Sequence, residues 1–188
     1  MKRNRIVPWV AFLALCLVLP LAGCKKSEPP PPAGEGEPIR LNAPAEIENY
    51  KGILRKDPDN LQALIGIGNL YFDTKQDAQA VASYRKALAL DPSNANVRTD
   101  MAICLRRMGQ FDLAVEELKK AISANPRHPQ SRYNLGVILL HDKNDLEGGI
   151  KAWEGLLENI PDYPYRDALK SEIARLRSAK PPERREYK

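Results

Sequence analysis

The chain has 188 residues, of which 28% are charged and 16 are proline, and its formal net charge is +5. This length suits one modest domain with attached segments. Three bases and no acid stand in residues 1–23, so a chain that begins at Cys24 carries 26 bases and 24 acids, a net charge of +2. Such a mild excess does not indicate nucleic acid as a partner, because nucleic-acid binding uses strongly basic surfaces.

Residues 1–23 begin with a basic stretch that includes Lys2 and Arg5 and continue into the apolar run 10–19. This run is shorter than the roughly 20 apolar residues of a membrane span, and it fits a secretory signal peptide. The segment closes on Leu-Ala-Gly before Cys24, which resembles the bacterial lipobox. The resemblance implies that the chain is cut before Cys24 and that the Cys24 thiol is acylated, which makes the protein a lipoprotein. An uncleaved anchor helix is the competing interpretation.

Residues 24–44 form the predicted linker, which follows the lipidated cysteine and is rich in proline. It is too poor in apolar residues to pack and too rich in proline to form helix or sheet. Polyproline II geometry gives twenty residues a reach of roughly 60 Å. We predict a tether, with a proline-rich ligand for a partner domain as the alternative. Lys25, in place of Asp, favours the outer membrane under the usual sorting rule for bacterial lipoproteins, so the protein would face the periplasm.

Prolines divide the next part of the chain into nearly equal units, because Pro58, Pro92, Pro126 and Pro161 are spaced 34, 34 and 35 residues apart. Small and large apolar residues recur at the same offsets in each unit, three and four residues apart, which indicates two amphipathic helices per unit. Each proline ends a helix, since it has no amide proton and its ring clashes with the preceding turn. The one extra residue of the third unit is predicted in the turn 141–145.

This pattern resembles the tetratricopeptide repeat, whose period and signature match it over residues 45–178. The resemblance implies an all-α fold, an α-solenoid of three helical hairpins at about residues 61–94, 95–128 and 129–163. Stacking is required because one hairpin cannot bury its own apolar stripe.

Two flanking helices are predicted to cap the stack. Residues 46–56 look like the second helix of a truncated unit, and residues 165–178 carry one apolar stripe on an otherwise charged helix. Capping helices with a polar outer face keep solenoids soluble. Residues 179–188 are predicted to be a disordered tail.

The cysteines and histidines do not predict catalysis. Cys16 leaves with the signal and Cys24 is acylated, so Cys104 is the remaining thiol and is expected to be a small buried hydrophobe. A single thiol makes no internal disulfide and no zinc cluster. His128 and His141 have no second ligand at metal spacing, and no glycine-rich phosphate loop is present. We therefore predict no enzyme activity, no metal and no cofactor.

The tetratricopeptide repeat family lines a concave groove with the first helix of each unit. Carried onto this sequence, the resemblance implies a peptide-binding groove made of Asn69, Phe72, Thr99, Asp100, Ile103, Arg106, Tyr133, Asn134, Val137 and His141. Amides suit the backbone of a bound segment and apolar groups suit its side chains. A solvated face without a ligand is the alternative. The carboxylate clamp of the cytosolic heat-shock cochaperones is not predicted, because only Asn69 matches it.

The sequence thus predicts a membrane-anchored scaffold or chaperone that binds a peptide or helix of another cell-envelope protein. Its partners would be that protein, through the groove, and the membrane, through the Cys24 lipid. Residues 148–177 also resemble the closing segment of tetratricopeptide modules in bacterial c-type cytochrome assembly, through Trp153 and the Pro161-Asp162 pair. That resemblance implies an apocytochrome-holding factor as an alternative. A pilus or outer-membrane assembly lipoprotein is another.

Overall fold

A computed structural model describes residues 42–179 of the chain. The predicted signal peptide, Cys24, most of the linker and most of the tail lie outside these residues. The described helices are α1 (Ala43–Lys56), α2 (Leu61–Asp73), α3 (Asp77–Leu90), α4 (Ala95–Arg107), α5 (Phe111–Ala124), α6 (Pro129–Val137), the π-helical turn η1 (Ile138–Asp142), α7 (Leu146–Asn159) and α8 (Arg166–Ala179).

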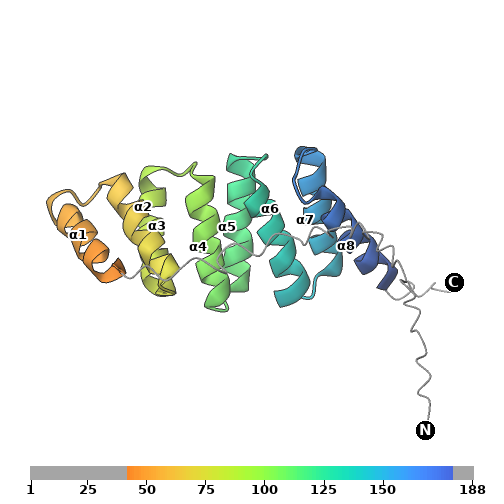
Figure 1. Cartoon of the computed structure of the whole chain (residues 1–188), viewed down its shortest axis with the longest axis horizontal. Coiled ribbons are helices and arrows are strands. Elements are labelled where there is room, and N and C mark those ends of the chain that lie inside the picture. The colour runs from red at the N-terminus through yellow and green to blue at the C-terminus, as the bar shows by residue number, and fades with distance from the viewer. Residues whose placement is uncertain (1–41, 180–188) are drawn as a thin grey trace, which may run out of the picture.

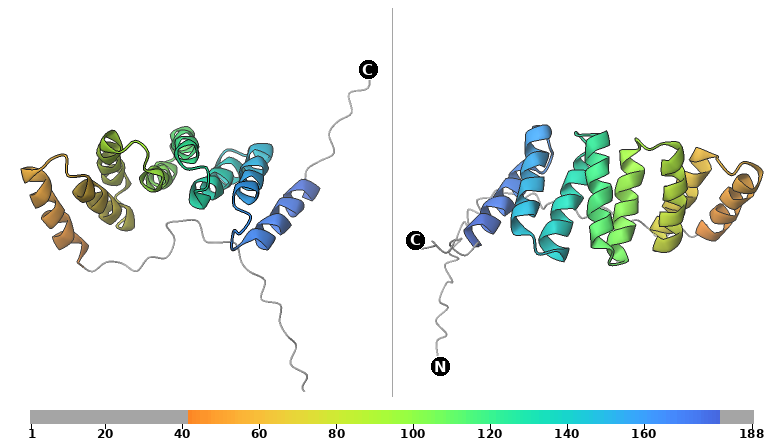
Figure 2. Two further views of the ribbon diagram at one scale, coloured as in Figure 1. Left: turned by 90° about the horizontal axis from the view of Figure 1, so that it is seen from above. Right: turned by 180° about the vertical axis from the view of Figure 1, so that it is seen from behind.

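The helices stack as an α-solenoid, which confirms the predicted fold class (Figure 1). The pairs α2/α3, α4/α5 and α6/α7 are antiparallel hairpins, and α1 and α8 close the two ends. Seen from above, the stack curves (Figure 2). Successive first helices contact one another, α2 with α4 and α4 with α6, and α3, α5 and α7 pack on their outer side. No helix within residues 42–179 is long and apolar enough to cross a membrane.

The hairpins begin and end at equivalent positions. The side chains of Asn60, Asn94 and His128 each accept a hydrogen bond from the backbone N–H three residues later. Such a cap satisfies a donor that the first turn of a helix leaves without a partner. The second helix of each unit ends two residues before the repeated proline, as α3 does at Leu90 before Pro92. The sequence repeat therefore places the starts and the ends of the helices at equivalent positions in each unit.

A small residue on the first helix receives a large one from the second helix in every hairpin. The pairs are Gly68 with Tyr84, Ala102 with Leu118, and Gly136 with Trp153. A Cβ on Gly68 would lie 2.6 Å from the ring of Tyr84, and one on Gly136 would lie 2.2 Å from Nε1 of Trp153. The two units whose second helix carries an aromatic residue here therefore require glycine on the first helix, whereas the unit with Leu118 accommodates alanine.

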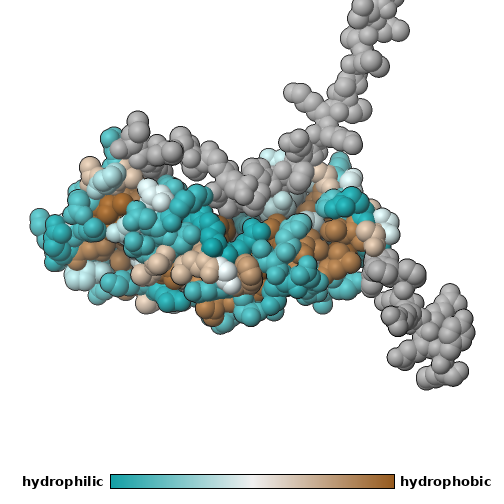
Figure 3. Space-filling model, turned by 90° about the horizontal axis from the view of Figure 1, so that it is seen from below, coloured by the Kyte–Doolittle hydropathy of each residue, from teal (hydrophilic) through white to brown (hydrophobic). Residues whose placement is uncertain are grey.

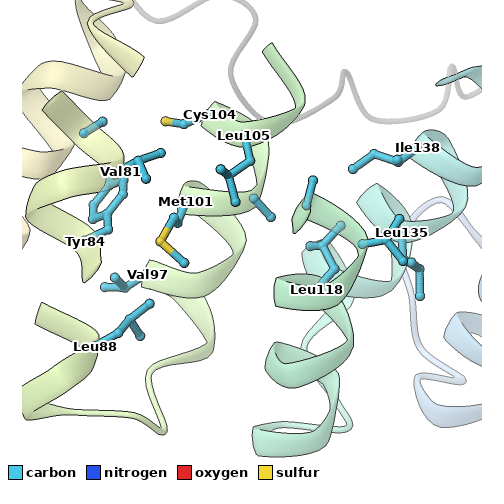
Figure 4. Packing of buried hydrophobic residues seen from close by; sticks show 14 of the residues in the cluster. Val81, Tyr84, Leu88, Val97, Met101, Cys104, Leu105, Leu118, Leu135 and Ile138 are labelled. Carbon is cyan, nitrogen blue, oxygen red and sulfur yellow. The ribbon is translucent and has the colours of Figure 1, made fainter. Parts of the chain in front are cut away.

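One apolar core runs through the first two units into the third (Figure 4). Tyr84 of α3 faces Met101 of α4, and Leu118 of α5 faces Leu135 and Ile138 of the next unit. The remaining surface is mostly hydrophilic with separate hydrophobic patches, as seen from below (Figure 3). The apolar stripes are thus buried between neighbouring units, as expected of a solenoid.

The extra residue of the third unit lies in a helix, and not in the turn 141–145 where the sequence placed it. In the first unit the N–H of Thr74 donates to the carbonyl of Leu70, four residues back. The equivalent carbonyl, that of Ile138, accepts from Lys143, five residues later, at 3.0 Å. The extra residue therefore widens the last helical turn into η1.

Candidate functional site

The open part of the concave face lies on α2 and α4. Asn69 is exposed, and Phe72, Asp100 and Arg106 are half-buried. The side-chain oxygen of Asn69 accepts a hydrogen bond from the Tyr84 hydroxyl at 2.9 Å, which fixes the orientation of its amide. This stretch combines an oriented amide, an aromatic ring and charged groups, which is the set that a bound peptide segment requires.

Arg107 joins the first two units beside this stretch. Its guanidinium donates to Asp77 of α3 at 2.8 and 2.5 Å and to the carbonyl oxygen of Phe72 at 3.2 Å, and it lies 4.3 Å from the centre of the Phe72 ring. A partly buried ion pair of this kind fixes the position of both partners more than it adds stability. Arg107 therefore holds Phe72 in place at the groove wall.

Asp100 places a carboxyl group in the same wall. Burial, and after it the charge of Asp73, raises the pKa of Asp100 to about 6 against the opposing effect of the Arg107 guanidinium. A carboxyl group with such a pKa changes its charge near neutral pH. The charge of the groove next to α2 is therefore sensitive to pH between about 5 and 7.

Half of the predicted groove residues are buried by the protein itself. Thr99, Ile103, Tyr133, Asn134 and Val137 are all less than 10% exposed. On the third unit the reason is α8, which takes the place of the first helix of a following unit. Its Leu169 and Ile173 form a cluster with Tyr133 and Val137. The sequence identified α8 as a cap, but the extent of its cover over α6 could be read only from the structure.

A series of side-chain hydrogen bonds joins α4 to α6 at Thr99, which was predicted to contact a ligand. The Thr99 and Ser131 hydroxyls lie 2.7 Å apart, and the Ser131 hydroxyl lies 2.6 Å from Nδ1 of His128. Nε2 of His128 lies 2.7 Å from the side-chain oxygen of Asn96. Because the Asn96 oxygen only accepts, Nε2 carries the proton and Nδ1 accepts. Burial lowers the pKa of His128, which favours this neutral form.

At the far end of the predicted groove, an ion pair joins α4 to η1. Arg106 donates to Asp142 of η1 at 2.5 Å, so its guanidinium already has an acidic partner. His141 is exposed. The pKa of Glu172 on α8 is lowered mainly by a hydrogen bond from Arg175, and the nearby His141 adds a smaller effect in the same direction. The structure thus leaves Asn69, Phe72, Asp100 and Arg106 at least partly accessible on α2 and α4, and an ion pair links Arg106 to η1, the element that carries His141.

Nothing within residues 42–179 forms a metal site: no group of three His, Cys, Asp or Glu side chains there could hold an ion. Cys104 is fully buried, as predicted, and burial raises the pKa of its thiol to about 12. A thiol of this kind is not a nucleophile at neutral pH.

Two family models, both described as tetratricopeptide repeat, match the chain at residues 61–94 and 78–130. Together they cover α2 to α5 and the first residues of α6. This is the part of the chain in which the period is uninterrupted, because the extra residue of η1 follows it.

Three curated relatives share the repeat. "Protein CTR9 homolog" of Arabidopsis thaliana is 29% identical over 143 residues, 73% of this chain and 13% of that protein. "Type IV pilus assembly protein PilF" of Pseudomonas aeruginosa is 28% identical over 181 residues, 94% of this chain and 63% of that protein. The probable peptide N-acetylglucosaminyltransferase SPINDLY of Petunia hybrida is 30% identical over 90 residues, 48% of this chain and 10% of that protein. The chain spans less than two thirds of the length of each.

Two solved structures show the same fold. The type III secretion translocator chaperone SycD of Yersinia enterocolitica has a TM-score of 0.58 and 17% identity, over 65% of this chain and 86% of that chain. The first tetratricopeptide domain of Spaghetti (RPAP3), bound to an HSP90 peptide, has a TM-score of 0.54 and 24% identity, over 63% of this chain and 94% of that chain. At these identities the likeness concerns the fold alone.

Proposed function

Because the chain carries tetratricopeptide repeats, a fold of protein-binding scaffolds and chaperones, we propose that it holds a segment of another cell-envelope protein in its concave groove. The observation that supports this most is the open stretch on α2 and α4. There Phe72 offers an aromatic surface, and the amide of Asn69 is oriented by Tyr84. A segment would place an apolar side chain on Phe72 and a backbone group on Asn69.

The proposed role is non-enzymatic. Among residues 42–179 the remaining thiol is buried, and Arg106 and Arg107 beside the groove are engaged in ion pairs with Asp142 and Asp77. The match to SPINDLY covers only a tenth of that protein, so it supports a shared repeat and not a shared reaction.

Pilus assembly in the cell envelope is the setting that the relatives favour. The match to the pilus assembly protein covers 94% of this chain, whereas the match to the CTR9 homolog covers 73%. Residues 42–179, which hold the solenoid, are 138 of the 188. A match of 94% therefore extends beyond the repeats into the flanking segments. None of the relatives described above is a cytochrome-assembly protein, so that alternative gains no support.

We include in the proposal that acylated Cys24 anchors the solenoid to the outer membrane, facing the periplasm. The lipobox-like sequence before Cys24 and the linker after it support this role. The tether would let the groove reach roughly 60 Å from the membrane surface.

The test compares chains that co-purify with the anchored protein from envelope membranes. The double variant Asn69→Ala/Phe72→Ala should lose the partner, since truncation of a buried anchor commonly costs about 2 kcal/mol or more of binding free energy. Arg85→Ala/Lys86→Ala, at exposed positions of α3, is the matched control and should retain it. Circular dichroism verifies that both variants stay helical.

A Cys24→Ala variant separates the anchor from the groove. It should accumulate as an unprocessed precursor, lose labelling by a fatty-acid probe and still bind the partner identified with the wild type. Retention of the partner by Asn69→Ala/Phe72→Ala, or its loss in the α3 control, would contradict the groove proposal.

A further inference from the structure

The open stretch of the groove on α2 and α4 has more acids than its bases neutralise. Arg106 is paired with Asp142, and Arg107 is paired with Asp77, so each arginine of this stretch already has an acid of its own. Two further acids remain, Asp73 at the end of α2 and Asp100 on α4. The groove wall therefore carries an excess of negative charge.

The fold makes no use of the Asp100 carboxyl group. Within residues 42–179 it accepts no hydrogen bond and forms no ion pair, and the charges that act on it are those of Asp73 and Arg107. Ionised Asp100 costs stability, since the folded chain raises its pKa to about 6. An ionisable group that destabilises the fold and faces an open groove is a candidate for binding.

The same offset of the other units serves the fold instead. The first unit has Gly66, where a Cβ would lie 2.4 Å from the ring of Tyr50. The third unit has Asn134, which is buried and donates to the carbonyl of Gln130 at 2.9 Å. Stacking of the units therefore does not require an acid at this position, and the second unit alone places one there.

Four polar side chains converge at this point of the groove. Asn69 and Asp73 are four residues apart on α2, so they share one face of the helix. The Tyr84 hydroxyl donates to Asn69 at 2.9 Å. Burial, and after it nearby charges that include those of Asp100 and Asp73, raises the pKa of Tyr84, which places both carboxyl groups close to the same hydroxyl. The seam between α2 and α4 thus presents two carboxylates beside an oriented amide.

A cation is the ligand group that this arrangement favours. A carboxylate would be repelled by two acids, and a neutral donor would leave their mutual repulsion in place. The guanidinium of Arg107 does not fill the role, because it donates to Asp77 and to the carbonyl oxygen of Phe72. The half-buried Phe72 ring offers apolar surface of the kind on which the methylene stem of a Lys or Arg side chain packs.

We propose that the groove selects a segment of its partner protein that carries a Lys or Arg side chain, whose cationic head lies between Asp73 and Asp100. The stem of this side chain would pack on Phe72, and the Asn69 amide would donate to a backbone carbonyl of the same segment. The inference rests on the proposed function, because it concerns the same groove, and it goes beyond it by fixing the charge of the residue that is recognised.

The probe is a set of three pools of acetylated and amidated heptapeptides. The central residue is Lys, norleucine or Glu, and the other positions hold an equal mixture of uncharged residues. An extended heptapeptide spans roughly 23 Å, enough to cross two helices about 10 Å apart. Norleucine keeps the stem of Lys without its charge. The immobilised full chain should retain the Lys pool at least about fivefold more than the norleucine pool, and the Glu pool least.

Charge-matched variants locate the preference. Asp73→Asn/Asp100→Asn should retain the Lys and norleucine pools equally, and loss of folding is not expected because Asp100→Asn relieves a buried charge. Asp59→Asn/Asp162→Asn removes the same net charge from two exposed turns and should keep the preference of the wild type. A preference that survives in the first variant, or is lost in the second, would overturn the proposal.

The preference should also depend on pH. A bound cation favours ionised Asp100, so retention of the Lys pool should fall at least about threefold between pH 7.5 and pH 5, as the pH passes through the pKa of about 6. The norleucine pool should change little, and Asp100→Asn should remove the difference. A preference for the Lys pool that is the same at both pH values in the wild type would contradict the role of Asp100.

The remaining outcomes separate this inference from the groove itself. If the wild type retained the Lys and norleucine pools equally and Asn69→Ala/Phe72→Ala lost both, the groove would bind a segment without selecting a base. No retention of any pool at about 1 mM would overturn the inference and leave the groove to the co-purification test. A preference that appears only in Arg40→Gln would assign the site to the chain's own linker. A dimer that Asp73→Asn/Asp100→Asn dissociates, measured by light scattering, would assign it to a second copy. Either result would overturn the proposal.

Discussion

Asp100 is a residue that the fold keeps partly out of water at a cost to stability. Its pKa is about 6 in the folded chain against an ordinary value of 3.8, so the fold favours the protonated form. A raised pKa contributes stability that is fully present below the unfolded value and is lost as the pH rises through the folded value. The folded chain should therefore become less stable between about pH 4 and pH 7 through this group.

Replacement of Asp100 by Asn removes this dependence. Asp100→Asn should raise the free energy of unfolding by about 1–3 kcal/mol at pH 8, because a shift of about two pKa units corresponds to about 3 kcal/mol before solvent screening. The gain should vanish near pH 3.5. Urea unfolding of both proteins at the two pH values measures it. A gain of the same size at both would show that ionisation of Asp100 is not its cause.

Single residues also mark the limit of prediction from the sequence. Thr99 and Asn134 stand at offsets that face the groove in the family, yet they are 2% and 3% exposed. Thr99 meets Ser131, 32 residues away, and the side-chain amide of Asn134 donates to the carbonyl of Gln130. Offsets predict the face of a helix, whereas burial depends on how closely the next unit approaches.

At the scale of the elements, one small and one large residue determine how closely the two helices of each hairpin approach. Gly68→Ala places a Cβ 2.6 Å from the ring of Tyr84 and should lower the free energy of unfolding by about 1–3 kcal/mol. The second unit already shows the compensating combination, Ala102 with Leu118. Addition of Tyr84→Leu should therefore lower the free energy of unfolding less in the Gly68→Ala background than in the wild type, with a coupling energy of about 1 kcal/mol.

Thermal and urea unfolding of the four proteins in this cycle measure the coupling. Gly52→Ala is the matched control, because its new methyl group would meet only Arg55, at 3.6 Å, and alanine favours the helix. It should be neutral or stabilising. Additive losses in the cycle would mean that the two side chains do not limit the approach of α2 and α3.

The elements that the sequence predicted well are those whose signals are local. The repeated prolines and the apolar spacing predict the helices without reference to distant residues, and the structure adds the caps at Asn60 and Asn94. The π-helical turn η1 was missed because an extra residue can be accommodated in two ways, by a longer loop or by a wider helical turn. The choice depends on packing: Leu140 lies against Gly149, where the other units have Ala80 and Ala114.

At the scale of the whole molecule, stability should decay along the stack from the end at which a cap is weakened. In a solenoid each unit contacts mainly its neighbours, so loss at one interface is felt locally. Ile173 of α8 is buried against the third unit, in one cluster with Tyr133 and Trp153. The cap therefore supports α6 and α7 directly, and α2 and α3 only through them.

Ile173→Ala removes apolar atoms from this interface and should destabilise the third unit by about 2–4 kcal/mol. Hydrogen exchange of backbone amides should accelerate in α6, α7 and α8, while α2 and α3 keep most of their protection. Lys170→Ala, on the exposed side of the same helix, controls for the change in helix propensity and should leave all of these rates unchanged. Equal acceleration from α2 to α8 would mean that the solenoid opens as one cooperative block, and that α8 stabilises the open groove on α2 and α4 as much as the unit it covers.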